Sequence, residues 1–118
     1  MITGTVRILP APDRRADVLE VLRLVQGRLQ HQTGCTACHI YQEDDPESTI
    51  VFVEQWTGDE ALACHLRSDI YQRILGAIEL SAKPPVISFE HVSATEGIEV
   101  IERSRDPART ARRTGGQS

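Results

Sequence analysis

The stretch TIVFVEQW, residues 49–56, is the strongest β-strand signal in the chain. β-branched and aromatic residues dominate it, and an acidic turn with a proline, EDDPES, precedes it. Because successive side chains of a strand alternate between faces, Phe52 and Trp56 share one face while Val51 and Val53 share the other. Both faces of this strand are therefore apolar, and both require cover from other parts of the molecule.

The segments on either side of this strand predict a ferredoxin-like fold. Strands are expected at 2–9, 35–42 and 86–92, with a short fifth segment at 98–102. Helices are expected across about 14–31 and 59–78, because apolar residues recur there every three or four positions: Val18, Leu22, Val25 and Leu29, then Leu62, Leu66, Ile70, Ile74 and Ile78. The order β-α-β-β-α-β predicts an α+β fold, with an antiparallel sheet and two helices on one face.

Two helices can cover only one face of such a sheet, so Val51 and Val53 need another partner. The economical solution is a second copy of the chain, packed sheet on sheet about a twofold axis. The sequence therefore predicts a homodimer formed through the sheet.

Length and charge limit the possible partners and locations. The 118 residues argue for one domain, expected over 1–102, followed by a disordered basic tail over 103–118. The tail has five arginines and one acid, a net charge of +4. The whole chain has a net charge of −4, so the first 102 residues have a net charge of −8. An acidic body predicts no nucleic-acid partner. No apolar run reaches the ~20 residues of a membrane span, and the absence of a signal-peptide pattern predicts a cytoplasmic location.

A CxxCH pattern occurs at Cys35-Thr36-Ala37-Cys38-His39, which is the spacing of covalent haem attachment. On a strand, however, positions 35 and 38 point to opposite faces, and Met1 is the only methionine available as a further iron ligand. Zinc remains a candidate because Cys64-His65 repeats the Cys-His pair, although neighbouring ligands on a strand diverge. We expect reduced, mostly buried thiols, no metal and no cofactor.

Residues 51–75, VFVEQWTGDEALACHLRSDIYQRIL, resemble the antibiotic-biosynthesis-monooxygenase superfamily, which includes quinol monooxygenases. The positions that carry the resemblance are Glu54, Trp56, Glu60-Ala61-Leu62, His65, Leu66, Ser68 and Tyr71. The likeness extends over about residues 2–92. It implies a dimeric α/β barrel, with a pocket between sheet and helices in which electron-rich aromatics are oxidised by dioxygen without metal or flavin.

The resemblance also suggests roles for individual residues, each with a structural alternative. His65 is a candidate base and Glu54 its buried partner, because a buried carboxylate needs a compensating group. Trp56 is either a stacking wall for the substrate or a core tryptophan, and Tyr71 either closes the pocket or fills the core. His39 and His91, on neighbouring strands, either line the cavity or are half-exposed sheet residues.

Two positions depart from specialised members of the superfamily. Polyketide-oxidising and haem-degrading members have an asparagine where this chain has Phe52, a candidate wall of the pocket that cannot form a hydrogen bond. Haem degraders also have an iron-ligating histidine where this chain has Leu75. Both specialised activities are therefore disfavoured.

Two hypotheses remain. The chain is either a cofactor-independent monooxygenase acting on a small aromatic or quinol, or a non-catalytic ligand-binding or sensing module on the same dimeric scaffold. The fold does not choose between them, since unrelated functions occur on one fold.

Overall fold

The computed structural model describes residues 1–106 and contains one four-stranded antiparallel sheet. The strands are β1 (Ile2–Ile8), β2 (Cys35–Gln42), β3 (Ile50–Trp56) and β4 (Val86–His91), in the spatial order β2-β3-β1-β4. The helices are α1 (Arg15–Leu29), α2 (Asp59–Leu66), α3 (Asp69–Glu79) and α4 (Ile98–Arg105), and a 3₁₀ turn spans Pro12–Arg14. This arrangement is the predicted ferredoxin-like α+β fold, with the TIVFVEQW segment as one of two central strands.

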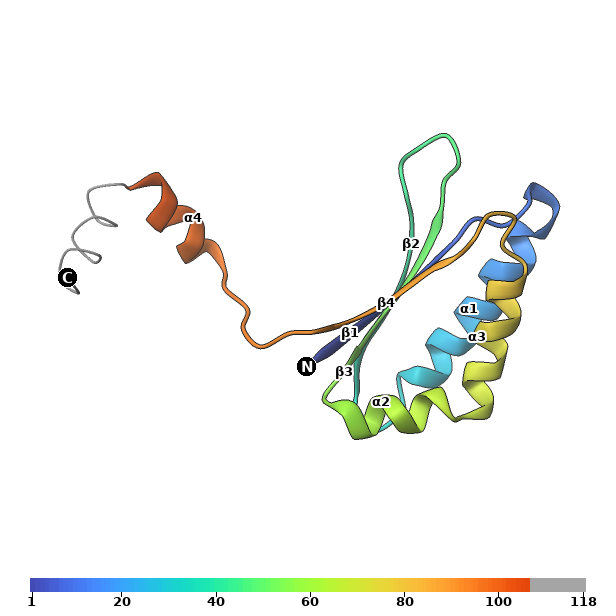
Figure 1. Cartoon of the computed structure of the whole chain (residues 1–118), viewed down its shortest axis with the longest axis horizontal. Helices are drawn as coiled ribbons and strands as arrows, with labels where there is room; N and C mark the ends of the chain where they lie inside the picture. The colour runs from blue at the N-terminus through green and yellow to red at the C-terminus, as the bar shows by residue number, and fades with distance from the viewer. Residues whose placement is uncertain (107–118) are drawn as a thin grey trace.

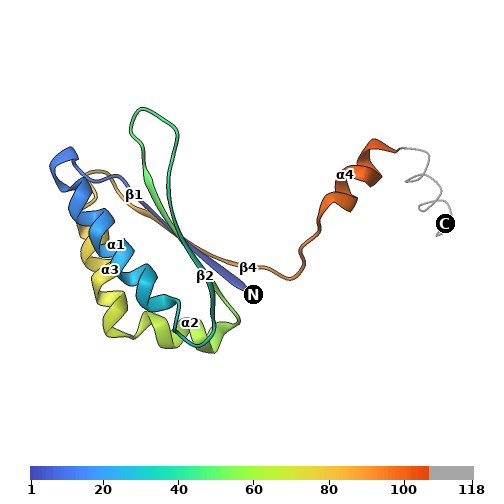
Figure 2. The same ribbon diagram turned by 180° about the vertical axis from the view of Figure 1, so that it is seen from behind.

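One face of the sheet is covered by α1, α2 and α3, as Figures 1 and 2 show from opposite sides. The core lies between these two layers. On the sheet side it takes alternate residues of β1 and β3, and on the helix side it takes the stripe predicted for the first helix: Ile2, Val6, Ile8, Ile50, Phe52, Trp56, Val18, Leu22, Val25 and Leu29. The two periodicities seen in the sequence therefore meet in this core.

The expectation of a single helix over 59–78 is wrong, because the helix is interrupted between α2 and α3. The Ser68 hydroxyl accepts a hydrogen bond from the Tyr71 N–H at 3.3 Å and donates one to the His65 carbonyl at 2.6 Å. A serine bonded in this way starts a new helix instead of continuing the old one, and Ser68 is the N-cap of α3. The chain changes direction at this break, as Figure 1 shows. Apolar residues of both helices are nevertheless buried: Leu62 of α2, and Tyr71 and Ile74 of α3.

The short fifth strand expected at 98–102 is also wrong, because these residues form α4. Figure 1 shows α4 on the side of the sheet away from the other helices, at the end of an extended connection that follows β4. A segment without a neighbouring strand has no ladder of hydrogen bonds to join, whereas a helix satisfies its backbone locally. The Glu99 carboxylate also accepts from the Gly97 N–H at 2.8 Å, and this bond lowers the pKa of Glu99.

The boundary expected after residue 102 falls inside α4. The remainder of the tail whose disorder was expected, residues 107–118, lies outside the described residues.

The second face of the sheet carries no helix among residues 1–106 (Figures 1 and 2). Strand register aligns Tyr41, Val51, Arg7 and Val86 in one row across this face, with His39, Val53, Thr5 and Ser88 in the next. Tyr41 and Val86 are 52% and 58% exposed. The prediction that Val51 and Val53 lie opposite Phe52 and Trp56 is confirmed.

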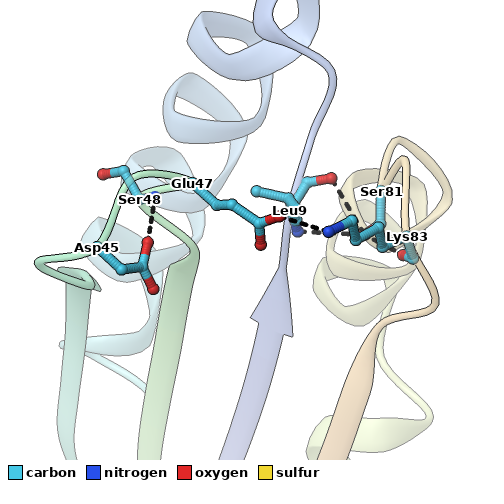
Figure 3. A network of polar contacts seen from close by, with 6 residues as sticks. All are labelled: Leu9, Asp45, Glu47, Ser48, Ser81 and Lys83. Carbon is cyan, nitrogen blue, oxygen red and sulfur yellow. Dashed lines mark hydrogen bonds and ion pairs between the residues drawn. The ribbon is translucent and has the colours of Figure 1, made fainter.

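The end of the sheet at the β2–β3 turn is held by polar contacts (Figure 3). Glu47 of this turn pairs with Lys83, which follows α3, and the Leu9 N–H donates to the Ser81 hydroxyl at 3.1 Å. Within the turn, Asp45 accepts from the N–H of Ser48, which has a positive φ of 52°. These contacts join three connections at one end of the fold, while α2, which follows the end of β3, lies at the other end.

Candidate functional site

A row of four residues crosses the helix-covered face of the sheet at its centre. The strand register places Cys38 opposite Glu54, Glu54 opposite Gly4, and Gly4 opposite Phe89. Glu54 lies in the second position of this row, on the strand that also supplies Phe52 and Trp56 to the core. The sheet therefore holds a carboxylate beneath the helices, and its side chain is only 2% exposed.

His65 of α2 is the partner of this carboxylate, as the sequence predicted. Its Nε2 lies 2.5 Å from Glu54 Oε2, and the His65 side chain is 1% exposed. A buried carboxylate is stable only when a nearby group compensates its charge, and the imidazole is close enough to do so. The Ser68 hydroxyl donates a hydrogen bond to the His65 carbonyl, and this bond fixes the end of α2 that carries the imidazole.

The two groups meet at ion-pair distance, but no hydrogen bond joins them. Glu54 Oε2 and His65 Nε2 therefore lack a hydrogen bond, as does the Trp56 indole Nε1. These three are the buried side-chain atoms without a hydrogen-bond partner in residues 1–106. Such atoms are rare in folded proteins, and their concentration around one pair is typical of a functional site.

Two aromatic side chains enclose the imidazole. The Trp56 ring stacks on His65 with centroids 4.5 Å apart and planes inclined by 27°, while Tyr71 of α3 meets the same imidazole edge-on at 5.3 Å. An aromatic wall excludes water and holds the imidazole in one orientation. Glu54, His65, Trp56 and Tyr71, hereafter the cluster, therefore come from β3, α2 and α3.

Burial and the negative charge of Glu54 both disfavour ionisation of the neighbouring acids. Burial, followed by this charge, raises the pKa of the Tyr71 phenol and of the Cys35 thiol. Burial, the charge of Glu54 and the nearby Cys35 together raise the pKa of Cys38 to about 12. Cys38 therefore stays a neutral thiol near neutral pH, which is the opposite of what a metal ligand or a reactive thiol requires.

The expectation that Cys35 and Cys38 point to opposite faces is wrong, because a bulge between Cys35 and Ala37 places Cys35 opposite Trp56 and Cys38 opposite Glu54. The thiols are also less buried than expected, since Cys35 and Cys38 are half-buried and Cys64 is exposed.

The structure brings four of the seven predicted site residues together and leaves three outside the cluster. Phe52 is fully buried in the core, two positions along the same strand face from Glu54. His39 lies on the uncovered face, 5.8 Å from the Tyr41 ring, because strand alternation turns it away from Cys38. His91 lies at the sheet edge, largely exposed, with its Nε2 3.0 Å from Asp59 Oδ1.

Gly4 and Phe89 belong to the same row and were not expected as site residues. A Cβ atom on Gly4 would lie 3.0 Å from the Phe89 ring and 4.0 Å from Glu54 Oε1. The sequence signal that could have found them is a glycine inside a strand, which often marks a close approach by another group.

The cluster is closed in this structure. A surface cavity of about 550 Å³ is lined by the turns before β2 and α2 and by Cys64, and neither this cavity nor three smaller ones on the described residues is lined by a cluster residue. Within the described part of the chain, no three His, Cys, Asp or Glu side chains gather closely enough to hold a metal ion, and no helix is long and apolar enough to cross a membrane.

The chain is thus a small α+β protein with a ferredoxin-like sheet, and it encloses an acid–imidazole pair and an aromatic wall between this sheet and its helices. The chain belongs to the antibiotic biosynthesis monooxygenase family, whose model matches residues 1–77. The resemblance stated from the sequence is thereby confirmed. No curated protein sequence matches the chain.

Solved structures share the fold at low sequence identity. Rv0793 from Mycobacterium tuberculosis superposes with a TM-score of 0.73 at 21% identity, covering 81% of this chain and 98% of its own. An antibiotic biosynthesis monooxygenase gives 0.70 at 15% identity, with 80% and 100% covered. PA3566 from Pseudomonas aeruginosa gives 0.67 at 22% identity, with 79% and 94% covered. At these identities the likeness demonstrates the fold alone.

Proposed function

We propose that this protein is a cofactor-independent monooxygenase that oxidises a small aromatic substrate of the quinol type with dioxygen. The observation that carries the proposal is the buried Glu54–His65 pair, stacked on Trp56 and touched by Tyr71. The family to which the chain belongs supports monooxygenase chemistry, and the cluster supplies the groups that such chemistry needs.

In the proposed reaction the imidazole of His65 takes the proton of a substrate hydroxyl, while Glu54 stabilises the imidazolium that forms. The resulting phenolate is electron-rich enough to give one electron to dioxygen, and recombination of the two radicals forms a carbon–oxygen bond. Loss of water then leaves an oxidised ring. The overall change is balanced: quinol plus dioxygen gives hydroxyquinone plus water, and the substrate supplies the electrons.

The unsatisfied polar atoms of the cluster support a hydroxylated aromatic ligand. A phenolic oxygen beside Trp56 Nε1 would accept a hydrogen bond from the indole N–H, which has no partner in this structure. A flat ring also stacks favourably on an indole. The neutral phenol of Tyr71, whose pKa is raised, remains a donor toward developing negative charge on the substrate.

The second candidate is a non-catalytic ligand-binding or sensing module, and one observation favours it. The indole N–H of Trp56 has no hydrogen-bond partner, and it can bind a polar group of a ligand without any proton transfer. In that case His65 and Trp56 would contribute to ligand-induced stabilisation without turnover.

We further propose that the protein works as a homodimer through its uncovered sheet face. The exposed side chains of Tyr41 and Val86 on this face, beside Val53, would be covered by the same face of a second copy. A cytoplasmic location is also proposed, because Cys35, Cys38 and Cys64 are free thiols, as expected in a reducing compartment.

The deciding experiment measures oxygen uptake by purified, metal-free protein over a panel of benzoquinols and naphthoquinols. We expect uptake with stoichiometric formation of hydroxyquinone. His65→Gln should lower kcat roughly 100-fold or more, the loss typical of a missing general base. The matched control is His31→Gln, which changes an exposed histidine outside the cluster.

Absence of uptake with every quinol would contradict the monooxygenase proposal. Thermal stabilisation by the same compounds, lost in His65→Gln and Trp56→Ala but present in His31→Gln, would then support the binding module. Circular dichroism of each variant separates loss of function from loss of fold.

A further inference from the structure

The entrance to the cluster is the unexplained feature of the fold, since Glu54 and His65 are buried in a site that must admit a ligand. On the helix side the core residues of α1 and α3 fill the space above β3 and β1. Of the two edges of the sheet, β2 is packed against α1, whereas β4 is exposed along almost its whole length, so the β4 edge is the more open one. There the row that contains Glu54 ends in Gly4 and Phe89.

Phe89 occupies the space that the missing side chain of Gly4 leaves free. Its Cε1 and Cδ1 atoms lie 3.0 and 3.1 Å from the position that a Cβ on Gly4 would take, and Glu54 Oε1 lies 4.0 Å from the same position. The Phe89 ring and the Glu54 carboxylate therefore border one small volume above Gly4. At the other positions of β1 on this face, the residue's own side chain fills the corresponding volume; these residues are Ile2, Val6 and Ile8.

Phe89 is also the least confined aromatic side chain near the cluster. It belongs to an edge strand and is 38% exposed, whereas Trp56 is fully buried and Tyr71 is 9% exposed. A side chain with one side open to solvent can change rotamer on the nanosecond timescale without disturbing the core. Rotation of Phe89 outward would uncover the Gly4 backbone and expose the edge of the Glu54 carboxylate.

We propose that Phe89 is the movable wall of the ligand site and that Gly4 is its floor, so that together they select a flat ring. A planar aromatic molecule would slide over Gly4 into the volume that Phe89 leaves and come to lie beside Glu54 and His65. A bulky or non-planar ligand would collide with the β1 side chains on either side of Gly4. This inference rests on the proposed function, because it concerns the access route to the same cluster.

The test uses Trp56, which is the only tryptophan of the chain and therefore reports on the cluster by its fluorescence. Quenching by acrylamide measures how often small molecules reach the indole. Phe89→Ala should raise the quenching constant several-fold over that of the unchanged protein, whereas Phe89→Leu should raise it less because part of the wall is retained. The matched control is Ile87→Ala, on the same strand face but opposite Val6 instead of Gly4.

A second measurement follows the binding of 1,4-naphthoquinone by stopped-flow quenching of Trp56. Phe89→Ala should raise the association rate about tenfold, because the site is then always open, whereas in the unchanged protein only the fraction of molecules with Phe89 rotated outward can bind. Gly4→Ala should weaken binding of the same flat probe, because the added methyl group occupies the floor.

Equal quenching constants for Phe89→Ala and the unchanged protein would overturn the inference, as would equal increases in Phe89→Ala and Ile87→Ala. The two proposals also fail separately. Faster quenching in Phe89→Ala without oxygen uptake on any quinol would support the entrance and contradict the oxidation. Oxygen uptake that depends on His65, together with an unchanged quenching constant in Phe89→Ala, would support the oxidation and contradict the entrance.

Discussion

At the scale of single residues, the main feature is a carboxylate and an imidazole that are both removed from water. Such a pair contributes little net stability when intact, because desolvation offsets the attraction, but it is costly to break. Glu54 and His65 are thus kept together by the cost of separating them. Their position between an aromatic wall and a row of sheet residues keeps that cost high.

Replacing His65 by alanine should therefore destabilise the protein strongly. We expect the free energy of unfolding to fall by about 3–5 kcal/mol, because Glu54 is left buried and uncompensated. Urea unfolding measures this loss. The control is the double variant Glu54→Gln/His65→Ala, in which no charge is buried and the loss should be smaller; equal losses in the single and double variants would contradict the pairing.

The cysteines should differ in reactivity according to burial. Cys38, whose pKa is raised to about 12, should react with iodoacetamide far more slowly at pH 8.5 than Cys64, which is exposed. Because the folded state holds the Cys38 proton more tightly than the unfolded state, this contribution to stability is complete below pH 9 and decreases as pH rises from 9 toward 12.

Mass spectrometry of labelled peptides gives the order of reaction, and labelling of Cys38 as fast as Cys64 would contradict it. Urea midpoints should fall more steeply between pH 9 and 11 in the unchanged protein than in Cys38→Ala. Parallel pH profiles would show that Cys38 has no part in alkaline unfolding.

At the scale of elements, the break between α2 and α3 determines where the cluster side chains point. Ser68 ends one helix by donating to the His65 carbonyl and begins the next by accepting from the Tyr71 N–H. A continuous helix would rotate Tyr71 with respect to His65, because consecutive residues of a helix follow one fixed angle. One hydroxyl thus connects the placement of two cluster residues.

Loss of this cap should be measurable. Ser68→Ala should lower the free energy of unfolding by about 1 kcal/mol, the usual effect of removing a serine N-cap. Ser68→Asp keeps an oxygen acceptor for the Tyr71 N–H and should retain most of the stability. Thermal unfolding of the three proteins measures the differences; a Ser68→Ala variant as stable as the unchanged protein would show that the break does not depend on the cap.

At the scale of the whole molecule, the two faces of the sheet have different surroundings. One face is covered by three helices, whereas the other presents the rows that contain Tyr41 and His39 and carries no helix in residues 1–106. In α4, Ile98 and Ile101 are also largely exposed. Exposed apolar surface of this extent is typical of a region that meets another protein surface.

The proposed homodimer predicts a change in mass on disruption of this face. The unchanged protein should sediment as a dimer at micromolar concentration, and Tyr41→Glu should sediment as a monomer because the dimer would have to bury a charge in place of an apolar ring. Leu24→Glu is the matched control, since Leu24 is comparably exposed but lies on α1. A stable, folded monomer of the unchanged protein would contradict the homodimer.

Much of the fold follows from the sequence, because local patterns report local geometry. Alternation in residues 49–56 predicted the faces of Val51 and Phe52, and helical spacing predicted the buried residues of α1. The strand predicted at 98–102 is a helix, because β-branched residues favour strands only where a neighbouring strand exists. The Ser68 break was hidden because the apolar spacing continues across it.

Part of the site was also predictable, since burial of Glu54 in an apolar strand demands a partner and His65 is near in sequence. The sequence by itself determined the order of strands and helical regions along the chain, the buried faces and this pair, because each depends on period, composition or short spacing. Only the tertiary structure decided that His65 joins the cluster while His39, in the same Cys-His context, faces away, and that Phe89 fills the place above Gly4. Strand register and the direction of a helix after a break join residues far apart in the chain, and no local period records them.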